Sequence, residues 1–268
     1  ARSQGDPERV HELALHALKQ HEGVLHELSY RFQSQRLLVK LKGQEVMPFG
    51  TAAGLDKNGQ ALYPLAQIFG FTEPGTVVVK PRDGNPRPRL YVDAPTGSVY
   101  NAQGFPSAGL ETFSRNLESY RDRGGTAPVY VSICGLPASE QYLDSALDEI
   151  EELVLRLGSM ADGFVWNPYS PNTAALRVLR TPQNFRETAD LISSRGIASH
   201  LRLVKMGPVP EGDDVSWLDL VAAWLEGGGD GVVAVNTYAV PKGAVPTESW
   251  GYESAGISGA YLKRHRQR

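Results

Sequence analysis

The sequence predicts an α/β fold built as a β/α barrel, and three observations favour this prediction. Short apolar or β-branched runs alternate with amphipathic helical segments, which is typical of a parallel sheet whose strands are joined by helices. Polar residues follow several of these runs at similar spacing: Ser132, Asn167, Lys205 and Asn236 are separated by 35, 38 and 31 residues. The first run leads into residues 52–59, which lack the G-x-G-x-x-G pattern of a doubly wound nucleotide-binding sheet.

Six runs are predicted to form the strands. They are Phe49–Ala53, Thr76–Lys80, Val129–Ile133, Phe164–Trp166, Leu201–Met206 and Gly231–Val235. Apolar residues at helical spacing predict a helix over 143–157, before the fourth run, and another over 217–225, before the sixth. In a barrel, functional residues lie at the carboxyl ends of the strands, where the polar residues named above are placed.

Two helices are predicted before the first strand. Asp6 and Pro7 form a helix start, with aspartate as N-cap and proline in the first turn. The apolar positions that follow at helical spacing are Val10, Leu13, Ala14, Ala17 and Leu18. A second short amphipathic segment follows Gly23. We expect residues 1–38 to form a helical extension and residues 39–268 the barrel. The periodicity leaves two roles for the extension open, a cap on the barrel bottom or a functional lid.

The bulk composition excludes several classes of function. The 268 residues are 41% apolar and 21% charged, which are ordinary globular values. A net charge of −3 gives no sign of a nucleic-acid partner. No run approaches the ~20 apolar residues that span a bilayer. Cys134 is the only cysteine, and neither H-E-x-x-H nor C-x-x-C occurs, so we expect no disulfide and no metal.

Amides, hydroxyls and lysines dominate the expected ends of the strands. They are Lys57, Asn101, Ser132, Asn167, Ser170, Asn172, Lys205, Asn236 and Thr237. Amides donate and accept hydrogen bonds in one plane, and lysine balances negative charge. This set therefore suits a planar, anionic ligand, and a flavin and a small carboxylate heterocycle both fit.

Six motifs in order resemble those of the dihydroorotate dehydrogenases, and the resemblance extends from about Asp6 to Lys263. The motifs are residues 52–59, 84–89, 170–173 with the preceding Asn167, 203–205, 235–237 and 256–259, the last in a loop beyond the sixth strand. Ser170 stands where the quinone-linked class has a serine base and the soluble class a cysteine. The two N-terminal helices are similar to the extension through which quinone reaches the flavin in that class, which favours the lid.

The resemblance implies oxidation of dihydroorotate to orotate in pyrimidine biosynthesis, with FMN as hydride acceptor and a quinone as final electron acceptor. Ser170 would be the base, with a relay through Thr173 and water lined by Phe105. The substrate would be bound by Lys57, Asn101, Asn167, Asn172, Asn236 and Thr237. The FMN would be lined by Ala53, Gly54, Lys57, Thr76, Ser132, Asn167, Lys205, Ser258 and Gly259. The protein would be membrane-peripheral, on the cytoplasmic side of a bacterial inner membrane or at the mitochondrial inner membrane.

Four residues depart from the family pattern. Pro106 and Ser132 stand where asparagines are usual, and Pro168 and Tyr169 stand where smaller residues are usual, so the loop before Ser170 is expected to be reshaped.

The number of predicted strands also departs from the family. The resemblance implies eight, and six strands leave an open edge. Three alternatives remain open: a second chain or fragment completes the barrel, the missing part was lost, or the chain is a divergent homologue without flavin that serves as a structural or interaction subunit.

Overall fold

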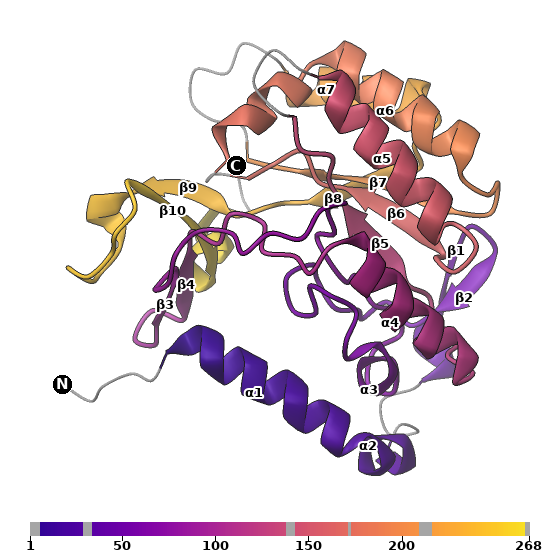
Figure 1. Ribbon diagram of the computed structural model, residues 1–268, viewed down its shortest axis with the longest axis horizontal. Helices are drawn as coiled ribbons and strands as arrows, with labels where there is room; N and C mark the ends of the chain where they lie inside the picture. Colours follow the sequence, from indigo (N-terminus) through magenta and orange to yellow (C-terminus); the bar gives the residue numbers. More distant parts are fainter. Residues whose placement is uncertain (1–5, 29–33, 138–142, 171–172, 209–215, 266–268) are drawn as a thin grey trace.

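The centre of the fold is a four-stranded parallel sheet with the order β5-β6-β7-β8. The computed structural model describes residues 6–28, 34–137, 143–170, 173–208 and 216–265. The four strands are Tyr130–Ile133, Gly163–Trp166, Leu201–Met206 and Gly231–Ala234. The helices that alternate with them are α4 (Leu110–Asp122), α5 (Asp144–Leu157), α6 (Pro182–Arg195) and α7 (Trp217–Glu226). The predicted alternation of strands and helices in a parallel sheet is confirmed (Figure 1).

The first two predicted strands are irregular. Single parallel bridges join Gly50 to Phe71, Thr72 to Val129 and Val77 to Ile133. The segment beside β5 therefore begins near Phe71, earlier than the predicted start at Thr76. Within the described ranges no pairing joins β8 to the Gly50 segment, so the structure shows a parallel sheet but not a closed barrel.

A second, antiparallel sheet has the order β3-β4-β10-β9. Its strands are Leu90–Asp93, Ser98–Asn101, Ser254–Gly259 and Tyr238–Pro241, in that order. Residues 256–259, expected in a loop, instead lie in β10. They adopt a strand because Gly256 pairs with residues on both neighbouring strands, and because Ala255 and Ile257 are buried in a satellite core with Trp250.

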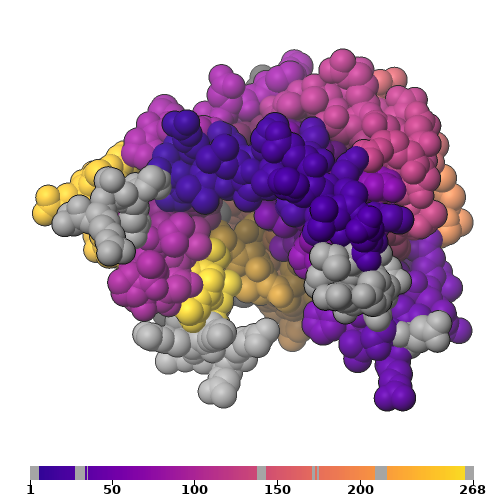
Figure 2. All heavy atoms as spheres, turned by 90° about the horizontal axis from the view of Figure 1, so that it is seen from below, coloured from indigo at the N-terminus to yellow at the C-terminus, as the bar shows by residue number. Residues whose placement is uncertain are grey.

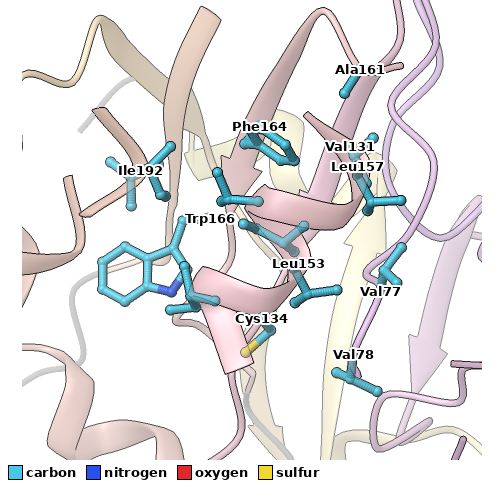
Figure 3. Packing of buried hydrophobic residues seen from close by; sticks show 14 of the residues in the cluster. Val77, Val78, Val131, Cys134, Leu153, Leu157, Ala161, Phe164, Trp166 and Ile192 are labelled. Atoms are coloured by element: carbon cyan, nitrogen blue, oxygen red, sulfur yellow. The ribbon is translucent and has the colours of Figure 1, made fainter. Parts of the chain in front are cut away.

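The main core lies between the parallel sheet and its helices. Trp166 stacks on Trp224 with ring centroids 5.9 Å apart and meets Phe185 edge to face at 4.9 Å. Figure 3 shows Trp166, Leu153 and Cys134 within this cluster. Burial raises the pKa of the Cys134 thiol, which therefore stays protonated and acts as a packing residue. This dense packing gives the carboxyl ends of the strands a rigid support.

The N-terminal helices are α1 (Pro7–Gln20) and α2 (Glu22–Leu28). The predicted helix start is confirmed, because Asp6 Oδ1 accepts a hydrogen bond of 3.0 Å from Glu8 N. Helix α1 packs through Leu15 against the short helix α3 (Leu62–Ala66). Figure 2 shows α1 and α2, in indigo, lying across one face of the molecule. The residues whose spacing predicted α1 mostly face outward, since Val10 is 59% and Leu13 57% exposed.

The remaining elements are short. They are the hairpin of β1 (Val39–Leu41) and β2 (Gln44–Val46) and the 3-10 turns η2 (Gln35–Leu37), η3 (Ala174–Leu179), η4 (Lys242–Ala244) and η5 (Ala260–His265). Of the helices in the described ranges, none combines the length and the apolar character that crossing a membrane requires.

Candidate functional site

A cavity of about 730 Å³ opens at the carboxyl ends of β6, β7 and β8. The segment after Gly50, the β3–β4 hairpin and α1, through Pro7 and His11, complete its walls. Most of the residues that the sequence singled out line this cavity. They are Ala53, Gly54, Lys57, Thr76, Asn101, Phe105, Asn167, Ser170, Lys205, Asn236, Thr237 and Ser258. Because parallel strands end at the same edge of a sheet, residues far apart in the chain meet here.

Three described residues of the predicted site do not line the cavity. Ser132 is fully buried beneath it, and its Oγ lies 3.0 Å from Thr76 Oγ1. Thr173 lies behind Ser170 and donates a hydrogen bond of 3.2 Å to Ser170 Oγ. Gly259 lies at the end of β10 with a φ of +82°, and a Cβ built on it would come within 2.4 Å of Gly97 O. Glycine at this position therefore allows the backbones of Gly259 and Gly97 to lie close together. Asn172 lies outside the described residues.

A chain of hydrogen-bonded side chains runs along the cavity floor. Asn236 Nδ2 donates to Asn167 Oδ1 at 3.1 Å, and Asn167 Nδ2 donates to Thr76 Oγ1 at 3.0 Å. Ser132 continues the chain below Thr76. These side chains come from β5, from the residues that follow β6 and β8, and from the segment beside β5, so the network holds their polar edges in place before any ligand binds.

Lys57 lies in a loop that is anchored by the preceding carboxylate. Asp56 accepts backbone hydrogen bonds from Gln60 at 2.9 Å and Ala61 at 2.7 Å. Lys57 Nζ donates to Gly54 O at 2.9 Å. Burial lowers the pKa of Lys57, while the negative charge of Glu8 on α1 opposes that shift. These hydrogen bonds therefore fix the Lys57 side chain at the cavity wall.

Lys205 is the second cation, and its partner is a residue that the sequence reasoning missed. Lys205 Nζ lies 3.7 Å from Glu73 Oε1, and both side chains are buried. Burial raises the pKa of Glu73, and the charge of Lys205 opposes that shift. The available signal was an acidic residue three positions before Thr76, but only the fold brings Glu73 close to Lys205.

Two further lining residues were also missed as site residues. His11 reaches the cavity from α1, and its Nε2 lies 2.5 Å from Leu55 O. Tyr169 forms part of the wall next to Ser170. Among the described lining residues none is aspartate or glutamate, so the immediate wall carries lysine charge without acidic charge. The described residues also contain no cluster of three or more His, Cys, Asp or Glu arranged to hold a metal.

Comparisons with known proteins identify the family. The family model "Dihydroorotate dehydrogenase" matches residues 36–266. The dihydroorotate dehydrogenase (quinone) of Stenotrophomonas maltophilia is 32% identical over 95% of this chain and 73% of its own length. That of Rhodospirillum rubrum is 34% identical over 98% of this chain and 70% of its own length. The chain belongs to the dihydroorotate dehydrogenase (quinone) family.

A solved structure of the same family gives the same result for the fold. The DHODH from Eimeria tenella, crystallised with ferulenol, superposes with a TM-score of 0.76 at 30% identity. The match covers 95% of this chain and 73% of the other. The family resemblance read from six short motifs is therefore confirmed, and the α/β fold matches that of a family member.

Proposed function

We propose that the cavity binds FMN and dihydroorotate, and that the protein oxidises dihydroorotate to orotate and passes the electrons to a quinone. The observation that carries this proposal is the convergence of the family motifs on one cavity. Lys57, Asn167, Lys205 and Asn236 come from four segments of the chain and meet there with Ser170. The described lining residues include two lysines and no acidic residue, which favours an anionic ligand, and the linked amides favour a planar one.

The cavity residues fit a flavin ring. Gly54 lines the cavity with a φ of +103°, and a Cβ built on it would meet no atom within 4 Å. The backbone is therefore open to the close approach of a flat ring. The volume of about 730 Å³ lies within the ~300–1,000 Å³ typical of ligand sites. The residues that would hold FMN are Ala53, Gly54, Lys57, Thr76, Asn167, Lys205 and Ser258, with Ser132 bracing Thr76 from below.

The remaining residues act on the substrate. Ser170 takes the proton from C5 of dihydroorotate, and FMN, when bound, supplies the acceptor for the hydride from C6. As Ser170 accepts the C5 proton, its own hydroxyl proton would pass to the water beside Phe105 and on to solvent, and the hydrogen bond from Thr173 would stabilise negative charge on Ser170 Oγ during this transfer. Phe105, which lines the cavity, would form the wall beside this relay water. Lys57 binds the substrate carboxylate, while Asn101, Asn167, Asn172, Asn236 and Thr237 hold the polar edges of the ring.

The N-terminal extension, residues 1–38, serves as the access lid for quinone, and residues 39–268 hold the FMN. Helix α1 reaches the cavity through Pro7 and His11, which supports a lid rather than a cap on the opposite end of the sheet. Val10 and Leu13 expose an apolar surface on the outside of the same helix. An exposed apolar helix face suits peripheral contact with a membrane that contains the quinone.

The cofactor is the first test of this function. The purified protein is expected to show flavin absorbance, or to gain it with quenching of FMN fluorescence when FMN is added. Gly54→Val is expected to weaken FMN binding, because its branched side chain would fill the open space above the backbone. Gly43→Val is the control, because Gly43 is exposed, also has a positive φ (+83°), and a Cβ built on it meets nothing within 4 Å. No bound or added flavin in the wild type would favour the non-catalytic alternative.

The electron acceptor is the second test. With dihydroorotate as donor, we expect steady-state turnover with a soluble quinone and little turnover with fumarate or NAD⁺. The physical reason is that α1, which lines the cavity through Pro7 and His11, exposes Val10 and Leu13 on its outer face, and this apolar surface suits an apolar acceptor. Turnover with fumarate or NAD⁺ but not with quinone would contradict the quinone assignment.

A further inference from the structure

The segment between β6 and Ser170 carries the bulky residue Tyr169 directly before the proposed base. Tyr169 is buried in the main core and also lines the cavity. Its ring lies against Gly207, the first residue after β7. A Cβ built on Gly207 would come within 2.2 Å of Tyr169 Cδ1 and 2.7 Å of Tyr169 Cε1. The missing side chain of Gly207 therefore creates the space that the tyrosine ring occupies.

The position of Gly207 is itself held. Gly207 O accepts a hydrogen bond of 3.1 Å from Trp217 Nε1 at the start of α7. The preceding residue, Met206, is fully buried in β7. Helix and sheet thus fix the backbone at Gly207, so a larger residue there must displace the ring rather than the backbone.

The tyrosine and its neighbours are also held from the other side of the loop. The Arg180 guanidinium lies 4.3 Å from the centroid of the Tyr169 ring, and Arg180 Nε donates to Pro168 O at 3.2 Å. Asn236 Nδ2 donates to Tyr169 O at 2.7 Å. The loop backbone is therefore tied at two consecutive residues, and Ser170 follows immediately.

We propose that Tyr169 is the positioning residue that sets where Ser170 Oγ lies in the cavity, and that Gly207 is its matched partner. The inference rests on the proposed function, in which Ser170 is the base. A rigid ring seated in a fixed space allows one loop conformation. A displacement of that ring passes to Ser170 through the shared backbone. Roughly 1 Å of misplacement of a reacting group costs about 10² in rate.

A double-mutant cycle with Gly207→Ala, Tyr169→Ala and the double variant tests the pairing. The first readout is the saturating rate constant for bleaching of the flavin by dihydroorotate. Gly207→Ala is expected to lower this constant about 10²-fold in the parent protein. In the Tyr169→Ala background, which is itself slow, the same change is expected to cost less than about 3-fold, because the clashing ring is gone. Gly243→Ala is the control, since a Cβ there meets no atom within 4 Å.

Three further readouts accompany the rate constant, and the first two separate positioning from general damage. The dihydroorotate concentration at half-saturation and the FMN dissociation constant are expected to stay within about 3-fold in Gly207→Ala, because the ligand-holding lysines and amides are untouched. Urea unfolding is expected to show the same coupling between the two substitutions as the rate.

The outcomes are distinguishable. An equal loss of rate from Gly207→Ala in both backgrounds, no loss at all, or a parallel loss of FMN affinity would overturn the inference while leaving the proposed function intact. Wild-type flavin that dihydroorotate does not bleach would overturn the proposed function and this inference with it.

Discussion

Replacing Ser170 with alanine is expected to slow the reduction of bound flavin by dihydroorotate by about 10²-fold or more, the contribution of a positioned general base. FMN binding should stay nearly intact, because the serine hydroxyl is held by Thr173 and contributes little to the flavin-holding residues. Stopped-flow bleaching of the flavin measures this half-reaction without the quinone step. Ser170→Cys should retain more activity than Ser170→Ala, because a thiolate still accepts a proton.

Ser194→Ala on the exposed side of α6 is the matched control, since Ser194 Oγ only donates to Leu191 O, within its own helix, and is remote from the cavity. Its bleaching rate should equal that of the wild type. Bleaching of the Ser170→Ala protein at the wild-type rate would mean that the base lies elsewhere or that dihydroorotate is not the substrate.

Replacing Arg89 with methionine is expected to lower the free energy of unfolding by about 3 kcal/mol, the lower end of the usual cost of removing one partner of a buried ion pair, because Arg87 still contacts the Glu8 carboxylate. Arg89 is buried before β3 and pairs with the buried Glu8 on α1 at 2.7 Å. Arg87→Met is the matched control, because Arg87 contacts the same carboxylate at 3.3 Å but is 45% exposed. Exposed pairs contribute at most about 1 kcal/mol. Urea unfolding of both variants measures the difference.

The pH dependence of the same pair has a defined sign. Burial acts to raise the pKa of Glu8, but the hydrogen bonds and charge of Arg89, with Arg87, hold that pKa below its usual value. The stability that this ion pair contributes is therefore fully present at pH values above the usual glutamate pKa. It is lost as the pH falls through the lower pKa that Glu8 has in the folded protein. The difference in free energy of unfolding between wild type and Arg89→Met should become smaller at low pH, because a protonated, neutral Glu8 is not stabilised by a nearby positive charge. A difference in unfolding free energy that stays constant with pH would contradict the lowered pKa of Glu8.

The general fold and most of the candidate site could be predicted from local patterns. Helix α1 begins where Asp6 and Pro7 predicted it, because capping depends on adjacent residues alone. Lys205 lies near the carboxyl end of β7 and Asn236 just after β8, and both line the cavity with Asn167 because parallel strands of one sheet end at one edge. The six motifs predicted the family for the same reason, since each is contained in a short stretch of chain.

The tertiary structure decided what depends on contacts between distant segments. Val10 and Leu13 have helical spacing whichever way α1 faces, and only the packing of Leu15 against α3 turns them outward. Residues 256–259 became a strand because β4 and β9 supply their backbone hydrogen bonds.

Two pairings beside the cavity show the same limit. Glu73 and Lys205 are 132 positions apart, and Tyr169 and Gly207 are 38 apart. The chain by itself determined which chemical groups stand at the strand ends. The fold decides which of these groups are in contact, and so which charge is balanced and which loop is held in place. The reason is that burial and close packing bring together segments that are far apart in the sequence.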